Sequence, residues 1–328
     1  METFIKYAGG KTREIPLIEK FLPKKINRFF EAFVGGGSIF LWLENEKSFI
    51  NDKSIELYNL YTLLKEQNVK LKQLLLNFNG LWIKVETNVS EKDFKSSLFS
   101  YAKYEEYYKK SLELKNKTFK RFLDKGLIIS SSDKEKAILT AKKTAVYMLI
   151  RDKYNTTKDK IEKTACFYFL REYCYSSMFR FSKSGNFNVP YGASSYNFKY
   201  LDKKINYMFS EELNNLLIKT QIYNLDFEDF FNSFEYNEND FIFLDPPYDS
   251  EFSTYDKNVF GREEQIRLCN NLKKIKAKWM LVIKKTDFIY NLYKDFNIYE
   301  YDKKYSVSFK NRNNKEAKHL LITNYEVK

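Results

Sequence analysis

The segment Asp245-Pro246-Pro247-Tyr248 offers the groups needed to hold an aromatic amine for reaction. It follows the apolar run 241–244, which predicts a strand, and the two prolines end that strand in a rigid, extended turn. The turn supplies one carboxylate, backbone carbonyls without competing N–H donors, and one aromatic face. Because the lone pair of an aromatic amine is delocalised, a carboxylate and a carbonyl that accept its N–H bonds favour a more nucleophilic nitrogen. A plain strand-ending turn with an exposed tyrosine is the alternative.

Two segments near the N-terminus contain glycines that let backbone approach a nucleotide-like ligand. The turn Gly35-Gly36-Gly37 lies between the predicted strand that ends at Phe33 and a predicted helix, where glycines permit such an approach. The spacing is neither GxGxxG nor a P-loop, and plain turn formation explains it equally well. In residues 7–11, Lys11 follows two glycines and can reach back to a carboxylate, while an aromatic ring can pack on an adenine or a sulfonium. A flexible N-terminal turn is the alternative there.

Asp52 follows the second predicted strand, residues 48–51. An acidic residue at this place commonly binds ribose hydroxyls in nucleotide-type folds. It can equally interact with the dipole of the following helix, for which Ser54 is the expected cap.

The composition limits the classes of function. The chain has 328 residues, enough for one large domain or a catalytic domain with a smaller one, and it is 44% hydrophobic. Its net charge of +13 favours a polyanionic partner such as nucleic acid, although an AT-rich coding sequence would enrich lysine in the same way. Three cysteines without CxxC spacing imply neither a disulfide nor a zinc site and fit a reducing cytoplasm. The single histidine, His319, argues against Ser-His-Asp catalysis and histidine-metal centres.

Hydrophobic periodicity divides the chain into three zones: 1–62, 63–214 and 215–328. The first and last alternate short strands with helices, as in a parallel α/β sheet. The middle zone is rich in lysine and mostly helical, with a predicted β-hairpin near 180–192. We therefore expect an α/β sheet split by a helical insertion, with neither a leader peptide nor a membrane span. The strands are predicted at 28–33, 48–51, 221–225, 241–244 and 279–283, with an antiparallel pair at 305–309 and 320–324; the helices are predicted at 38–43, 54–64, 69–76, 136–154, 162–178 and 262–275.

Five motifs in this order, with the hairpin segment, resemble the Dam family (D12 class) of DNA adenine-N6 methyltransferases. The resemblance implies a Rossmann-like S-adenosylmethionine-dependent methyltransferase fold, a mixed seven-stranded sheet with an inserted helical DNA-recognition domain carrying a β-hairpin. Tyr7 departs from the family's usual tryptophan but keeps the aromatic face, and Ala32 replaces a proline. The motifs are Tyr7-Ala8-Gly9-Gly10-Lys11, Phe33-Val34-Gly35-Gly36-Gly37-Ser38, Asn51-Asp52, Asp226-Phe227 and Asp245-Pro246-Pro247-Tyr248.

The resemblance also implies residue roles on the cofactor side. Tyr7 and Lys11 would contact S-adenosylmethionine, and Asp52 would bind its ribose hydroxyls. Asp226 and Phe227 would hold its adenine. Phe33, Gly35 and Gly37 would line the methionine side of the same site.

On the substrate side, Asp245 would bind the target N6 amine close to the methyl donor, with Pro246 beside it. Tyr248 would stack on the adenine, which must be extruded from the duplex to be reached. A wedge from Phe181 or Phe187 could assist extrusion. On the hairpin, residues with groups suited to base edges and phosphates are Arg180, Lys183, Asn186 and Asn188. The helix residues Lys142, Lys143, Arg151 and Lys153 are interpreted as a solvated face or, alternatively, as phosphate contacts.

The expected enzyme is a site-specific, adenine-specific DNA methyltransferase. It would act as a monomer on double-stranded DNA in the cytoplasm of a bacterium or a phage host, without a metal, and release S-adenosylhomocysteine. A separately acting restriction endonuclease is an expected partner, and GATC is the recognition site that the resemblance suggests. Asp245 argues against N4-cytosine enzymes, which tend to have serine there, and ribosomal-RNA adenine enzymes, which tend to have asparagine. A catalytically inactive DNA-binding relative is the remaining alternative.

Overall fold

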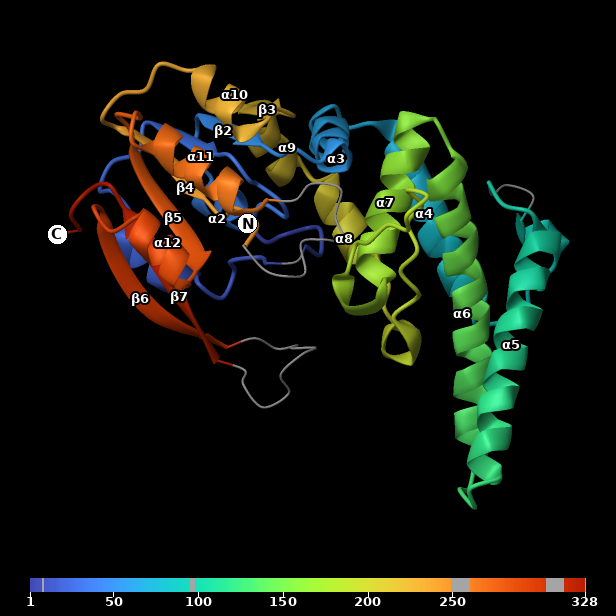
Figure 1. Cartoon of the computed structure of the whole chain (residues 1–328). Coiled ribbons are helices and arrows are strands. Elements are labelled where there is room, and N and C mark those ends of the chain that lie inside the picture. Colours follow the sequence, from blue (N-terminus) through green and yellow to red (C-terminus); the bar gives the residue numbers. More distant parts are fainter. Residues whose placement is uncertain (8, 95–97, 249–259, 305–315, 328) are drawn as a thin grey trace. The chain divides into compact units, whose positions relative to one another are not determined.

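The computed structural model describes residues 1–7, 9–94, 98–248, 260–304 and 316–327. The chain forms two compact units (Figure 1). The sheet unit comprises Met1–Thr3, Gly9–Thr62 and Asn215–Lys328, and the helical unit comprises Phe4–Ala8 and Leu63–Asn214. Among the described residues, no helix is both long and apolar enough to cross a membrane.

Within the described residues, seven strands form one mixed sheet in the order β3-β2-β1-β4-β5-β7-β6. The first five run parallel to one another, whereas β7 runs antiparallel to both β5 and β6. The predicted mixed seven-stranded sheet is therefore confirmed. The strands are β1 (Arg28–Glu31), β2 (Ser48–Asn51), β3 (Thr220–Tyr223), β4 (Asp240–Leu244), β5 (Lys278–Lys284), β6 (Asn297–Lys304) and β7 (Glu316–Thr323).

The C-terminal antiparallel pair was predicted only in part. β7 covers most of the predicted strand 320–324, but its partner is β6, Asn297–Lys304, which the prediction missed. The predicted strand 305–309 lies outside the described residues. Segment 297–304 carries five charged or amide side chains, so its hydrophobic pattern is too weak to identify a strand.

The central strands are apolar because helices cover them. Phe30, Ile242 and Trp279 belong to one buried cluster with residues of α10 (Phe227–Asn232), α11 (Arg262–Leu272) and α12 (Asp287–Leu292). Parallel strands buried in this way read as continuous hydrophobic runs, which explains why β4 and β5 were recognisable in the sequence. The remaining elements that lie wholly in the sheet unit are α1 (Ile15–Ile18), η1 (Glu19–Phe21) and α2 (Ser38–Leu43). Two helices cross the boundary between the units: α3 (Ile55–Lys65) and α9 (Glu211–Ile218).

The helical unit is built on capped helices. Ser130 and Asp133 form a reciprocal capping box at the start of α6, which makes this helix longer than the predicted 136–154. In contrast, α7 ends at Tyr173 instead of 178, because Cys174 is extended and Ser176 and Ser177 have positive φ angles of 51° and 56°. The elements are α4 (Val69–Lys84), η2 (Glu91–Phe94), α5 (Tyr101–Leu123), α6 (Ser131–Thr156), α7 (Lys160–Tyr173), η3 (Tyr175–Ser177), η4 (Ala193–Tyr196) and α8 (Asp202–Met208).

Candidate active site

The residue Asp245 lies where open α/β sheets bind their ligands. It follows β4 directly, and β4 is the neighbour of β1 in the centre of the sheet. From β1 the chain continues to β2 and β3 on one side, and from β4 it continues to β5 on the other. The strand order therefore reverses between β1 and β4, and ligands bind outside the carboxyl ends of strands at such a switch point. The glycine turn after β1 and Asp245 after β4 flank this point.

Lys11 is the direct partner of Asp245. Its side chain is only 2% exposed, its ammonium forms an ion pair with the Asp245 carboxylate, and it donates to Tyr248 Oη (3.0 Å) and Gly9 O (3.0 Å). Burial raises the pKa of the Asp245 carboxyl above its ordinary value, and the Lys11 ammonium opposes this rise. The predicted reach of Lys11 to a carboxylate is therefore present, and it places the acid, the lysine and the tyrosine ring together.

The glycine turn requires its glycines. Gly35 and Gly37 have φ angles of 50° and 71°, in the left-handed region that favours glycine. A Cβ atom on Gly37 would lie 2.5 Å from the hydroxyl oxygen of Tyr61, which itself donates to Gly35 O (3.2 Å). The turn also fixes Asp52, because Gly35 N donates to its Oδ2 (2.9 Å) while Ser54 N donates to its Oδ1 (2.9 Å). Asp52 is thus oriented at the carboxyl end of β2, beside the turn.

The carboxylate of Asp226 has several partners within the protein, which the sequence did not indicate. It caps α10 by accepting from Glu228 N (3.1 Å), and both its oxygens accept from the guanidinium of Arg267 (2.7 and 2.9 Å). Lys53 lies 3.4 Å from Oδ2. The Arg267 guanidinium also lies over the ring of Phe227, with its carbon 4.2 Å from the ring centre. Phe227 is buried and packs against Phe33, with ring centres 5.8 Å apart.

Several neighbours of the site had no recognisable signal in the sequence. Arg267, which holds Asp226, is one of them. Glu14 and Lys303 form a second ion pair, and their charges act on Asp245 in opposite directions. His319 is fully buried with its ring edge-on to Tyr248 at 5.4 Å between centres, and burial lowers its pKa to about 3. His319 is therefore neutral at physiological pH. Its position in the sequence gave no sign of this.

Comparison with known proteins agrees with this geometry. The family model for D12 class N6 adenine-specific DNA methyltransferases matches residues 7–307. The chain belongs to this family. It is 29% identical to the type II methyltransferase M.CviBI of Paramecium bursaria Chlorella virus NC1A over 99% of this chain and 100% of that protein. It is 30% identical to the type II methyltransferase M.MjaIII of Methanocaldococcus jannaschii over 99% of both. The DNA adenine methylase of Haemophilus influenzae is 24% identical over 85% of this chain and 77% of that protein.

Family membership confirms the reaction class predicted from the motifs. The family acts on the N6 atom of adenine in DNA, which favours the predicted reaction over the N4-cytosine and RNA-adenine alternatives. The seven-stranded mixed sheet agrees with the methyltransferase fold that the resemblance implied.

The recognition hairpin expected of this D12-class methyltransferase is a short antiparallel turn. Phe181 and Phe187 form an antiparallel bridge, and Gly185, at φ 80°, donates to Ser182 O (2.9 Å). Phe187 is buried against Phe179, so it belongs to the core of the helical unit instead of forming a wedge. Phe181 is partly exposed. The exposed residues of the hairpin include Arg180, Lys183, Asn186 and Asn188.

The interpretation of the α6 lysines as a solvated face or as phosphate contacts is wrong for Lys143. This side chain is fully buried, with its ammonium paired with Glu86 (2.7 Å) and 4.6 Å from the ring centre of Trp82. Lys142 is half-buried and donates to Thr87 O (2.8 Å). Lys153 pairs with Glu162 (2.8 Å). The reason is that α6 packs against α4, α5 and α7, which leaves the side chains between residues 139 and 155 buried or half-buried.

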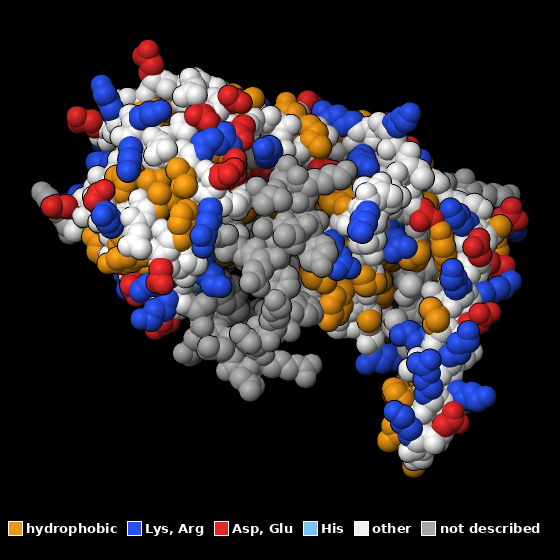
Figure 2. All heavy atoms as spheres, in the orientation of Figure 1, with side chains coloured by type: hydrophobic (Ala, Val, Ile, Leu, Met, Phe, Trp, Pro, Cys, Tyr) orange, Lys and Arg blue, Asp and Glu red, His pale blue; other side chains and the backbone are white. Residues whose placement is uncertain are grey.

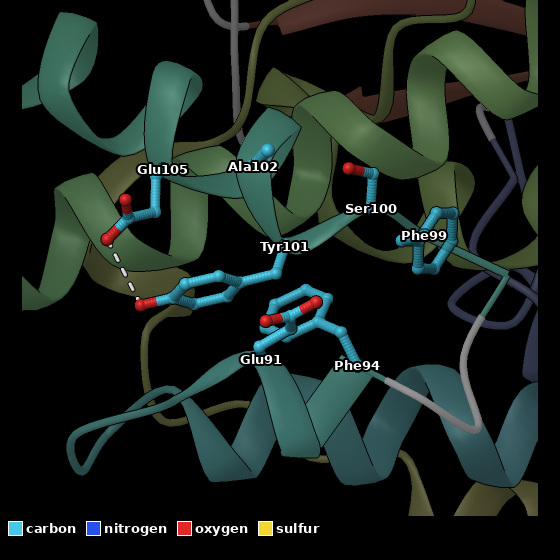
Figure 3. Close-up of a pocket in the computed structure, with 7 residues that line it drawn as sticks. All are labelled: Glu91, Phe94, Phe99, Ser100, Tyr101, Ala102 and Glu105. Atoms are coloured by element: carbon cyan, nitrogen blue, oxygen red, sulfur yellow. Dashed lines mark hydrogen bonds between the residues drawn. The ribbon is translucent and has the colours of Figure 1, made fainter.

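The visible surface carries basic side chains over both units of this methyltransferase, including the two long helices α5 and α6 (Figure 2). A pocket of about 390 Å³ lies between η2 and the start of α5 (Figure 3). Its lining includes Phe94, Tyr101 and the carboxylates of Glu91 and Glu105, and Tyr101 Oη bonds to Glu105 (3.0 Å). None of the predicted site residues lines it, and its acidic groups are unsuited to phosphate.

Proposed function

We propose that this chain transfers a methyl group from S-adenosylmethionine to the N6 amine of an adenine that is flipped out of duplex DNA. The observation that carries the proposal is the Lys11–Asp245–Tyr248 group at the switch point of the sheet, in a chain of the D12 class. It unites one acidic acceptor, one cation that favours the ionised form of the acid, and one aromatic ring.

The chemistry of the described residues fits S-adenosylmethionine. Gly35 and Gly37 carry no side chain, so the backbone of the turn would be able to approach the cofactor closely. Asp52 would hold the ribose hydroxyls, and Phe33 would line the methionine side with the glycine turn. Lys11 and Tyr7 would contact the cofactor from the N-terminal segment. When bound, the cofactor supplies a methyl carbon attached to a positively charged sulfur.

The adenine end is assigned differently from the sequence prediction. A carboxylate has about four acceptor positions. Asp226 uses them on Glu228 N, on two nitrogens of Arg267 and on Lys53. We therefore assign adenine recognition to the backbone near Asp226 and to the ring of Phe227, while the Asp226 carboxylate positions them through Arg267.

Asp245 and its neighbours would prepare the target amine. An ionised Asp245 accepts one N–H bond of the amine, and a carbonyl of the Pro246–Pro247 turn accepts the other, which makes the nitrogen lone pair more available. Burial favours the protonated form of Asp245, and Lys11 favours the ionised form. Tyr248 stacks on the base, with its hydroxyl held by Lys11 (3.0 Å).

Recognition of DNA is assigned to the hairpin. Arg180, Lys183, Asn186 and Asn188 expose groups that bind base edges and phosphates, and partly exposed Phe181 is the candidate wedge. Two of the relatives are named type II methyltransferases. We therefore propose that this chain modifies the recognition site of a restriction system, with the endonuclease acting separately.

The test is sequencing of DNA from cells that express the protein, with a readout of N6-methyladenine. Methylation at one short sequence is expected, and its loss in Asp245→Ala with DNA binding retained would support the assigned role. Purified protein offered DNA and RNA side by side should methylate DNA alone. If S-adenosylmethionine neither stabilises the protein against heat nor supports any transfer, the chain is an inactive DNA-binding relative.

A further inference from the structure

The N-terminal motif is divided between the two units. Gly9, Gly10 and Lys11 belong to the sheet unit, whereas Phe4–Ala8 belongs to the helical unit. Phe4 is fully buried, and its carbonyl accepts from Tyr168 Oη of α7 (3.0 Å). The backbone N–H of Lys6 donates to Glu172 of the same helix (2.8 Å). The segment from Phe4 to Lys6 is therefore bound to α7.

Arg171 connects this segment to the start of the hairpin. It lies in the last turn of α7 and is only 4% exposed. Its guanidinium carbon lies 4.0 Å from the ring centre of Tyr7 and 4.8 Å from that of Phe179. One guanidinium nitrogen donates to Ser177 O (3.3 Å), and within the described residues its Nε has no hydrogen-bond acceptor. A third ring, Phe167, lies 5.8 Å away, so the cation is surrounded mainly by aromatic rings, an attractive arrangement when desolvated.

The ring of Tyr7 lies in a segment with an assigned role, and the ring of Phe179 lies directly before another. Phe179 stacks on Phe187 of the hairpin, with ring centres 4.3 Å apart. Between α7 and Phe179, Ser176 and Ser177 have left-handed backbone, which non-glycine residues adopt only when their surroundings hold them there. The Arg171 bond to Ser177 O is one such support. Arg171 thereby contacts the root of the hairpin and the aromatic ring of the N-terminal motif together.

The covalent path from Tyr7 to the active site is short. Tyr7 and Lys11 are four residues apart, so at most about 14 Å of extended chain separates them. Lys11 in turn holds Asp245 and Tyr248. Tyr7, whose ring contacts Arg171, is therefore joined to Lys11 by a short covalent connection.

We propose that Arg171 is a positioning residue that couples donor binding to DNA recognition. The inference rests on the proposed function, which assigns Tyr7 to the donor and residues 180–188 to DNA. When the hairpin engages its site, Arg171 holds Tyr7 in the arrangement that binds the donor. Since coupling between two ligands is reciprocal, donor binding strengthens specific DNA binding by the same factor.

The experiment compares Arg171→Met with Lys143→Met, a matched control. Lys143 is another buried cation of the helical unit that lies over an aromatic ring, but its partners are Trp82 and Glu86. Calorimetry gives the Kd of S-adenosylhomocysteine for each full-length protein, alone and with a duplex that contains the site found by sequencing. In the wild type we expect the duplex to tighten binding by roughly 5- to 150-fold, the usual range of coupling. Arg171→Met should bring this ratio close to one, Arg171→Lys should restore part of it, and Lys143→Met should keep the wild-type ratio.

A purely structural role would give a different pattern. If Arg171 were only structural, Arg171→Met and Lys143→Met with the same loss of thermal stability would lower the duplex-dependent tightening of S-adenosylhomocysteine binding equally. That result would overturn the inference. A wild-type ratio of one, or an unchanged ratio in Arg171→Met, would also overturn it. These outcomes leave the proposed function standing as long as the wild type methylates adenine in DNA. Failure of the wild type to methylate DNA would instead refute the proposed function.

Discussion

Replacing Lys11 by methionine should weaken the sheet unit in a pH-dependent way. Lys11 is 2% exposed and Asp245 19% exposed, so the variant leaves a mostly buried carboxylate without its nearest cation. Breaking a fully buried pair costs about 3–5 kcal/mol, and the remaining solvent contact of Asp245 places the expected cost nearer 2–3 kcal/mol. That cost corresponds to a roughly 30- to 160-fold change in the opening equilibrium of the unit.

The sign of the pH dependence follows from the pKa of Asp245. Burial already raises this pKa above the ordinary 3.8, and the Lys11 ammonium is the main group that lowers it. Without Lys11, the pKa of Asp245 therefore rises further. A carboxyl with a raised folded pKa binds its proton more tightly in the folded state, so ionisation weakens the fold. The deficit of Lys11→Met should therefore be largest at neutral pH. It should shrink as the pH falls through the raised pKa and Asp245 becomes protonated.

Hydrogen exchange of the β4 amides measures the opening free energy of the sheet unit separately from that of the helical unit. The double variant Lys11→Met/Asp245→Asn provides the control, because it removes both charges. We expect its cost to be smaller than the sum of the two single costs by about 2 kcal/mol, a typical value for residues in contact. Additive costs, or a Lys11→Met deficit that does not shrink as the pH is lowered into the range where Asp245 becomes protonated, would refute the reasoning.

Three further variants have specific expected outcomes. Gly37→Ala should lose at least about 1–2 kcal/mol of stability in urea, because φ is 71° and the new Cβ meets Tyr61 Oη, and adding Tyr61→Phe should recover part of the loss. Glu172→Gln should cost about 3–5 kcal/mol at neutral pH, since this fully buried carboxylate is paired with two lysines. Burial raises the pKa of Glu172, but the two lysines together outweigh burial, so the pKa is lowered. The contribution of Glu172 is therefore present above the ordinary 4.5 and is lost as the pH falls through the lowered pKa. Equal acid unfolding of both proteins at every pH would contradict this. Arg180→Ala should change stability by no more than about 0.5 kcal/mol but cost about 1–3 kcal/mol of site discrimination, seen as methylation of additional sequences; an unchanged set of sites would disprove the hairpin assignment.

The parts of the site that could be predicted from the sequence depend on local signals. Asp245 was recognisable because an apolar run and two prolines mark a strand end within eight residues. Its partner Lys11 was a candidate through its residue type and two preceding glycines. Arg267 could not be predicted in the same way, because it stands in an amphipathic helix that resembles any solvated one. Its role depends on the packing of α11 beside α10, which lets Arg267 donate to both carboxylate oxygens of Asp226.

The net charge of the sequence does not show which cations can contact DNA, because it counts buried and exposed residues alike. Lys143 counts toward the +13 of the chain, yet it is fully buried and neutralised by Glu86. A cation held in this way releases no counterions from DNA, so it adds nothing to the salt dependence of binding. The slope of log Kd against log salt should follow the exposed cations, such as Lys183 on the hairpin, instead of the total charge. Net charge therefore indicates the class of partner, whereas burial decides which residues can bind it.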